Sequence, residues 1–206
     1  MKFPKILLCA GFLLGAQVLC AQEENRHHSL ALQWGIYIPS DGGFLNHAAT
    51  VSPSLEWDWR ISNTFSIGAA AGYIRGSEQG FTQDRYEGDL VTGPSDRSLL
   101  LVPLTVHLRW IPVTFLQQRL QPFVGAGIGA QYAGFRIGGD LINKSQANSW
   151  GAFVRPEAGI GFSPRQNGRI CIEIKCGWQY ASNKFPVMHV QSLRGVQVST
   201  GIRYRF

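Results

Sequence analysis

Charged side chains in this sequence recur two residues apart, within short segments that are otherwise apolar. Carboxylates and cations at this spacing could support acid–base chemistry, a proton or ion path, or a set of ion pairs. The residues concerned are Glu56, Asp58, Arg60, His107, Arg109, Arg155, Glu157, Glu173, Lys175, Arg203 and Arg205. Because buried charges must be paired to be tolerated, we expect a structural network of ion pairs, with a proton path or a catalytic carboxylate pair as the alternatives.

A second candidate for chemistry is the segment Tyr180-Ala181-Ser182-Asn183. It resembles the His-x-Ser-Asn motif of outer-membrane lipid A deacylases, in which the histidine and serine act with a downstream glutamate on an eight-stranded barrel. Here Tyr180 occupies the histidine position, and no acidic residue follows Glu173. A serine without a general base is a poor nucleophile, so we assign no catalytic residue and expect a non-enzymatic protein. A lipid-modifying enzyme with His189 as a substitute base is the alternative.

The sequence offers no recognisable metal or cofactor motif. His27 and His28 are adjacent, so in a strand they would point to opposite faces. The acidic segment 84–89 lacks the spacing of a calcium-binding loop. The glycines of segment 125–129 alternate with other residues and no helix pattern follows, which excludes a nucleotide-binding loop. We therefore expect no metal and no cofactor, and we expect these glycines to leave room for long side chains opposite them.

The elements that must position the charged residues are strands, because apolar and polar residues alternate with a period of two. In segment 196–206, Val196, Ile202 and Tyr204 fall on one face of a strand, while Arg203 and Arg205 fall on the other. The same alternation predicts eight strands, over about 30–38, 50–61, 65–75, 98–111, 120–133, 150–162, 169–180 and 196–206. An apolar outer face and a polar inner face are typical of an all-β, antiparallel up-and-down transmembrane β-barrel.

The connections between the predicted strands alternate in length. Long polar loops are expected over 76–97, 134–149 and 181–191, whereas the connections after the second, fourth and sixth strands are shorter. Outer-membrane barrels combine short periplasmic turns with longer extracellular loops. The sequence therefore predicts that the second set of connections is periplasmic and that the long loops are extracellular.

Aromatic residues on the apolar face gather toward the strand ends. Membrane interfaces enrich Trp and Tyr at both edges of the lipid layer, so two belts are expected. The periplasmic belt would contain Trp57, Trp59, Phe65, Trp110, Phe162, Tyr204 and Phe206, and the extracellular belt Tyr73, Tyr132, Trp150, Trp178 and Tyr180.

The first 21 residues have the pattern of a secretory signal peptide, with Lys2 and Lys5 before an apolar run that is too short to span a bilayer. Cleavage is expected after about Ala21, leaving 22–206 as one outer-membrane β-barrel domain; a lipid anchor on Cys20 is the minor alternative. Of the four cysteines, Cys171 and Cys176 then remain, and their odd separation predicts opposite faces of one strand and no disulfide between them.

The charge and the barrel width limit the classes of function. Removing Lys2 and Lys5 lowers the net charge from +6 to +4, and the basic residues form no run, so nucleic acid is not an expected partner. Eight-stranded barrels are narrow enough to be filled by side chains, which disfavours a pore. A soluble lipocalin-like barrel is the competing fold class, but its outer face would have to be the polar one.

These patterns, and the aromatic residues Tyr204 and Phe206 at the end of the last strand, resemble the OmpA/OmpX-type outer-membrane β-barrel family. The resemblance implies a small, porin-like, bacterial outer-membrane protein without a peptidoglycan-binding domain. It implies a role in membrane integrity, or in adhesion through the extracellular loops. The expected partners are outer-membrane lipid and lipopolysaccharide, and the outer-membrane assembly machinery through the C-terminal strand. We expect a monomer.

Overall fold

The computed structural model describes residues 27–40, 50–86, 89–112, 115–116, 119–139, 142–165, 168–184 and 192–206, with the backbone alone at 50, 78–86, 89–95, 137, 139 and 142–145. Its strands are β1 (His28–Pro39), β2 (Thr50–Val51), β3 (Ser54–Arg60), β4 (Phe65–Gly72), β5 (Ile74–Tyr86), β6 (Asp89–Trp110), β7 (Leu120–Gly139), β8 (Ile142–Phe162), β9 (Ile170–Ala181) and β10 (Leu193–Arg205). The described ranges hold no helix that is long and apolar enough to cross a membrane. The predicted signal peptide and residue His189 lie outside the described residues.

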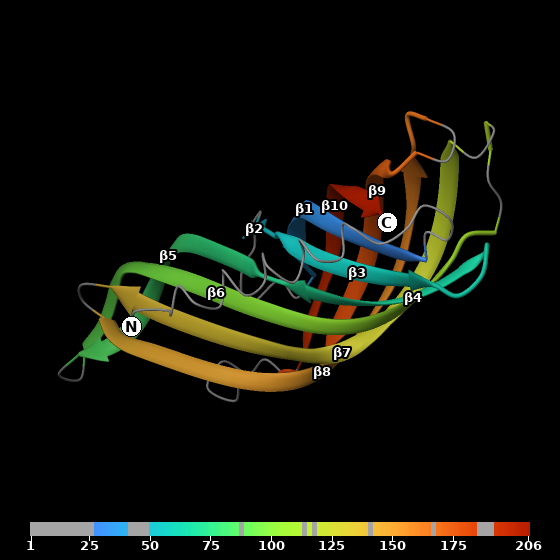
Figure 1. Cartoon of the computed structure of the whole chain (residues 1–206). Coiled ribbons are helices and arrows are strands. Elements are labelled where there is room, and N and C mark those ends of the chain that lie inside the picture. The colour runs from blue at the N-terminus through green and yellow to red at the C-terminus, as the bar shows by residue number, and fades with distance from the viewer. Residues whose placement is uncertain are drawn as a thin grey trace, which may run out of the picture.

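The strands close into a barrel with antiparallel pairing throughout (Figure 1). The closing ladder joins β1 to β10, from Ser29 opposite Arg205 to Pro39 opposite Gly195. The C-terminal strand is therefore paired on both sides, with β9 as its other neighbour, and leaves no open edge in the barrel wall. This arrangement confirms the predicted all-β, up-and-down barrel.

The ten strands correspond to eight barrel strands, because two of the barrel strands are each divided into two segments by a proline. One proline lies within the divided strand and the other lies on the neighbouring strand. β2 and β3 share one register against β1, with the break at Ser52-Pro53. β4 and β5 share one register against β6, with the break next to Gly72, which lies opposite Pro103. A proline has no amide hydrogen to donate to the ladder, which explains both breaks. The predicted strands 50–61 and 65–75 each span one of them.

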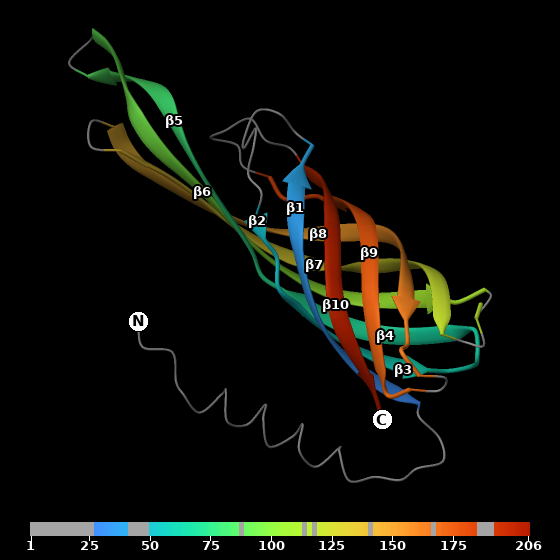
Figure 2. The same cartoon turned by 90° about the horizontal axis from the view of Figure 1, so that it is seen from above.

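The prediction of long loops over 76–97 and 134–149 is wrong. β5 and β6 continue as a hairpin to the pair Tyr86–Asp89, and β7 and β8 continue to the pair Gly139–Ile142. Figure 2 shows both hairpins extending beyond the ends of β1 and β10. These extensions are mostly polar in sequence, and their apolar residues, such as Phe81 and Leu90, follow no period of two, so the hydropathy pattern disappears although the backbone ladder still pairs the amides. β10 likewise begins at Leu193 rather than at Val196.

The barrel thus has two different ends, which we name by their connections. The hairpin end carries the projecting β5–β6 and β7–β8 hairpins (Figures 1 and 2). The turn end carries the connections β3–β4, β6–β7 and β8–β9, together with the C-terminus. His28 and Phe206 exchange backbone hydrogen bonds there, at 3.3 and 2.9 Å. These bonds hold the first strand and the C-terminus of the chain together at the turn end.

The outer wall is apolar and exposed, whereas the inner wall is polar and buried. Leu32, Ile128 and Ile202 on the outside are 60%, 66% and 59% exposed. This distribution is the reverse of that in a soluble protein and matches a wall surrounded by lipid. Cys171 is buried and Cys176 is exposed, which confirms the prediction that they occupy opposite faces of β9.

Candidate functional site

In the half of the barrel toward the turn end, charged side chains from five strands fill the lumen. β3, β6, β8, β9 and β10 each contribute side chains that point inward, because alternate residues of a strand share a face. We call this set the charged layer: Glu56, Asp58, His107, Arg109, Arg155, Glu157, Glu173, Lys175 and Arg203. All of these residues are buried, and a continuous set of ion pairs joins them.

Glu173 and Arg203 form the centre of the charged layer. Glu173 accepts hydrogen bonds from Arg203 Nε at 2.5 Å and from Arg203 Nη2 at 3.0 Å. It also accepts from Arg109 Nη1 at 3.1 Å and from Gln33 Nε2 at 3.2 Å. Arg203 in turn donates to Asp58 and, at 3.2 Å, to Glu56. One guanidinium therefore links three carboxylates from two different strands.

A second group of contacts extends the charged layer toward β8. Lys175 donates to Glu56, and its Nζ lies 3.6 Å from Glu157. Arg155 lies 3.6 Å from Glu157 and donates to Gln197 at 3.0 Å. Every carboxylate in the charged layer therefore contacts a cation. Such a neutralised set fits a structural plug, and it leaves no unpaired carboxylate to act as a general base.

The contact between His107 and Asp58 depends on a glycine opposite it. Nε2 of His107 lies 2.7 Å from Oδ1 of Asp58. A Cβ on Gly68 would lie 2.6 Å from that same nitrogen and 2.7 Å from that same oxygen. On β7, a Cβ on Gly127 would lie 2.6 Å from Cγ2 of Thr105. The glycines of these strands therefore provide space for inward side chains, as expected for segment 125–129.

Arg60 and Arg205, which the sequence grouped with the other charged residues, lie apart from the charged layer. Both are half-buried at the turn end. Arg205 donates to Oε1 of Gln121 at 2.6 Å. Neither arginine makes an ion pair with any residue in the part of the chain that the structure describes.

Next to the charged layer, on the side of the hairpin end, the lumen contains neutral carboxamide side chains. Gln179 donates to Gln131, and Gln131 donates to Oδ1 of Asn183 at 3.2 Å. Asn183 donates to the backbone oxygens of Gln131 at 3.1 Å and of Ser149 at 3.0 Å. These three fully buried carboxamides are hydrogen-bonded in a chain across the lumen and connect β7 to the end of β9, while Oε1 of Gln179 has no partner among the described residues.

Nearer the hairpin end, the lumen is closed by an apolar cluster that sequence reasoning missed. We call it the apolar layer: Tyr37, Ile74, Leu99, Leu101, Ala133, Phe135, Phe153, Ala181 and Leu193. The available signal was the run Leu99-Leu100-Leu101, which is apolar on both faces of β6. A run without alternation indicates burial on the inner as well as the outer side. The lumen therefore holds buried side chains of different chemistry at two levels.

The predicted belt residues lie on the outer wall, although Tyr132 and Trp150 fall within β7 and β8, away from the ends of these strands. Trp57, Trp59, Phe65, Tyr73, Trp110, Trp150, Phe162 and Trp178 are exposed, and Tyr132, Tyr180, Tyr204 and Phe206 are half-buried. Neighbouring rings contact each other across strands, as Phe65 does with Trp110 at 6.3 Å and Tyr132 with Trp150 at 5.4 Å between centroids. These rings therefore share the outer surface, and their grouping into two interfacial belts stays a prediction.

In the segment that resembles the deacylase motif, the side chains of Ser182 and Tyr180 contact neighbouring strands. The hydroxyl of Ser182 is exposed and accepts the amide hydrogen of Ala152 at 3.0 Å. The ring of Tyr180 stacks on Trp178 and lies beneath the guanidinium of Arg194 at 5.3 Å. In the described ranges, the hydroxyl of Ser182 makes no hydrogen bond with a histidine or a carboxylate. Those ranges also contain no cluster of three or more His, Cys, Asp or Glu side chains that could hold a metal ion.

Solved structures with the same architecture are outer-membrane barrels. Neisserial surface protein A has a TM-score of 0.60 at 16% identity, over 89% of this chain and all of that one. Ail, the attachment invasion locus protein of Yersinia pestis, has a TM-score of 0.54 at 13% identity, over 87% of this chain and 97% of that one. The Ail structure in complex with the heparin analogue sucrose octasulfate has a TM-score of 0.52. These similarities confirm the predicted fold, an eight-stranded outer-membrane β-barrel.

No protein-family profile matches the sequence, and no curated protein matches it. The structures named above share the fold of this chain, but their sequences are at most 16% identical to it.

Proposed function

We propose that this protein is a non-enzymatic, non-conducting barrel of the bacterial outer membrane that presents an interaction surface outside the cell. The observation that carries the proposal is the continuation of β5–β6 and β7–β8 beyond the rim, above a lumen that the charged layer and the apolar layer fill. In this orientation the hairpin end is extracellular and the turn end is periplasmic, as in barrels with short periplasmic turns.

The filled lumen supports a surface role over transport. A narrow pore needs a continuous water path, whereas the apolar layer places Leu101, Phe135 and Phe153 across the lumen, each nearly inaccessible to solvent. The alternative of a lipid A deacylase is disfavoured by Ser182, whose hydroxyl accepts a backbone amide hydrogen instead of contacting a base.

The neighbouring structures support an adhesive role by analogy. The Yersinia neighbour is named an attachment invasion locus protein, and the Neisseria neighbour is named a surface protein. In the present chain, the β5–β6 hairpin carries Glu78, Asp84, Asp89 and Asp96 against Arg85 and Arg97. We expect this acidic hairpin to favour a basic partner, because complementary charge increases the rate of association.

Hairpin truncation tests the adhesive role. One variant lacks residues 80–95 and the other lacks residues 138–144, with the remaining paired ends joined by Asn-Gly, a favoured two-residue turn. Bacteria that produce the full chain should attach to an epithelial cell monolayer more than bacteria with an empty vector, and truncation should abolish the gain. Barrel folding is checked by heat-modifiable gel mobility. Equal attachment by full-length and doubly truncated barrels would contradict an adhesive role.

A role in membrane integrity is a second candidate, favoured by a basic hollow on the outer wall. The hollow has a volume of about 280 Å³, and it is lined by Arg75 and Arg136 next to Tyr73 and Tyr132. None of the described residues that line it is acidic. Two arginines directly beyond predicted interfacial tyrosines are placed to bind the phosphate groups of lipopolysaccharide.

Mass spectrometry of lipid retained by the purified barrel tests this second role. Replacing Arg75 and Arg136 together by alanine should reduce the retained lipopolysaccharide, whereas Arg194→Ala, at another exposed arginine near the hairpin end, should not. Equal retention by all three proteins would exclude the hollow as a lipopolysaccharide site.

The proposal also includes assembly into the membrane through the C-terminal strand, with its aromatic residues Tyr204 and Phe206.

A further inference from the structure

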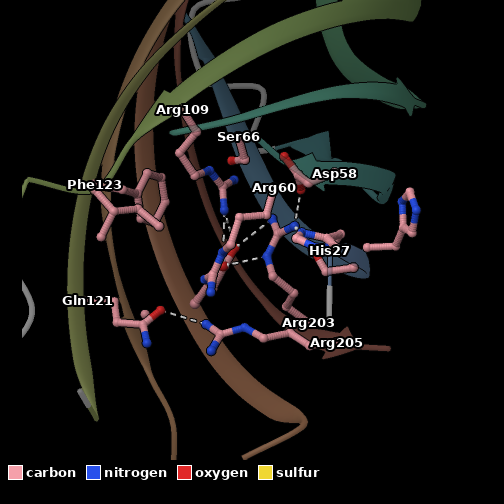
Figure 3. A pocket seen from close by; sticks show the side chains of 14 residues that line it. His27, Asp58, Arg60, Ser66, Arg109, Gln121, Phe123, Arg203 and Arg205 are labelled. Atoms are coloured by element: carbon pink, nitrogen blue, oxygen red, sulfur yellow. Dashed lines mark hydrogen bonds and ion pairs between the residues drawn. The ribbon is translucent and has the colours of Figure 1, made fainter. Parts of the chain in front are cut away.

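A hollow of about 40 Å³ lies at the turn end, at the opposite end of the barrel from the proposed interaction surface. Figure 3 shows Arg203 and Arg205 reaching into it from β10, with Gln121 on the other side. Exposed His27 and half-buried Arg60 and Arg205 form its outer part, and buried Arg109 and Glu173 form its floor. This volume would hold roughly three water molecules or one small ion.

The hollow carries an excess of positive charge. Within the charged layer, the carboxylates of Glu56, Asp58, Glu157 and Glu173 match the cations Arg109, Arg155, Lys175 and Arg203 in number. The carboxylates of the floor are thus already neutralised by cations within the layer. Arg60 and Arg205 are additional, and both face the hollow. Two guanidiniums that share a partly buried space repel each other unless an anion lies between them.

Further hydrogen-bond donors line the same space without protein partners. Nε of Arg109 is buried and has no partner among the described residues. Ser66 is 7% exposed, and Figure 3 shows its side chain beside the guanidinium of Arg109. The hollow therefore gathers guanidinium and hydroxyl groups, a set of donors that suits an oxyanion with several acceptor oxygens.

We propose that this hollow is a binding site for a phosphate group, held chiefly by Arg60 and Arg205. The planar guanidinium matches the geometry of phosphate oxygens and remains charged at any physiological pH. The ring of His28 stacks at 5.6 Å on Trp57 and at 6.2 Å on Phe206, two residues of the predicted periplasmic belt. The site therefore lies at the level of the inner-leaflet headgroups, so the phosphate comes either from a phospholipid headgroup or from free phosphate.

Calorimetric titration of the barrel in detergent micelles with inorganic phosphate, against chloride at equal ionic strength, tests the site. We expect saturable binding that Arg60→Gln and Arg205→Gln each weaken about tenfold, the loss expected for one charged hydrogen bond. Arg169→Gln is the matched control, because Arg169 lies exposed at the same end and its guanidinium donates to the hydroxyl of Tyr204 at 3.5 Å, outside the hollow. Binding that is equally weakened by Arg169→Gln, or unaffected by all three changes, would overturn the proposal.

Two further arms complete the experiment. Mass spectrometry of barrels from phosphatidylglycerol nanodiscs identifies the source: a retained phospholipid that is lost in Arg60→Gln and Arg205→Gln assigns the site to a headgroup, whereas binding of inorganic phosphate alone assigns it to free phosphate. Glu23 and Glu24 closely precede His27 in the sequence and could compete with added phosphate. The titration is therefore repeated with both changed to glutamine, and absence of binding there and in the unchanged chain overturns the proposal. Attachment to cells is unaffected by any of these outcomes.

Discussion

The charged layer and the apolar layer fill the same lumen by opposite means. In the charged layer each side chain depends on a specific partner, as Glu173 depends on Arg109 and Arg203. In the apolar layer Leu101 and Phe153 depend only on volume and burial. Loss of one ion leaves a buried charge without its partner, whereas loss of one apolar side chain leaves a cavity. The two layers should therefore respond differently to substitution.

The largest effect is expected from Arg203→Met, which leaves contacts of Glu56, Asp58 and Glu173 unfulfilled. Breaking a buried ion pair on one side typically costs about 3–5 kcal/mol of unfolding free energy. Urea titration of the barrel in lipid vesicles, followed by tryptophan fluorescence, measures the loss. Arg169→Met, at an exposed position, should change the free energy by less than about 0.5 kcal/mol. Equal losses for both variants would mean that pairing in the charged layer does not stabilise the barrel.

A somewhat smaller loss is expected from Leu101→Ala in the apolar layer. Leu101 is fully buried, so the substitution should cost about 3 kcal/mol through lost burial and a residual cavity. Leu104→Ala on the same strand is the control, because Leu104 is 48% exposed on the outer wall. The same urea titration compares them. If the outward change cost more than the inward one, the apolar layer would not be a packed core.

Adding volume to the charged layer should cost less than removing a charge. Gly68→Ala places a Cβ against both His107 and Asp58, and overpacking of this kind costs about 2 kcal/mol. Gly134→Ala is the matched control, since its Cβ would meet nothing closer than Oδ1 of Asn148 at 3.3 Å. Urea midpoints of the two variants should separate; coincident midpoints would show that the layer yields easily.

The smallest effect is the coupling between Glu56 and Lys175, which contact each other directly. Glu56→Gln and Lys175→Met should each destabilise the barrel, whereas the double variant should lose about 1 kcal/mol less than the two losses added together. A double-mutant cycle from four urea titrations measures this coupling. Strict additivity would indicate that the many other contacts of Glu56 carry the stabilisation instead.

The period of the sequence predicted the barrel and its two faces, but not the length of the hairpins or the partners in the lumen. Alternation is a local property, so Arg203 and Ile202 could be assigned to opposite faces from the sequence alone. The extensions of β5–β8 are mostly polar, with scattered apolar residues that follow no period of two, so no alternation marks them. The pairing of Arg203 with Asp58 joins β10 to β3 across the lumen, which no spacing within one strand encodes.

The same limit explains why Arg60 and Arg205 could not be separated from the other charges. Both lie two residues from network members, Asp58 and Arg203, and follow the same alternation. Only their depth distinguishes them, since they sit at the turn end where the strands run out. The apolar layer is not predictable for a related reason. Leu99 and Leu101 are flanked by other apolar residues of β6, so no alternation shows which face of the strand they occupy.

Conductance across a planar lipid bilayer tests most directly whether the two layers close the lumen in series. We expect no channel openings for the unchanged barrel, for Arg203→Ala or for Phe135→Ala, because each single variant keeps one layer intact. The double variant Arg203→Ala with Phe135→Ala should conduct. Steady openings of the unchanged barrel, with folding verified by heat-modifiable mobility, would contradict a closed lumen and restore the pore as the function.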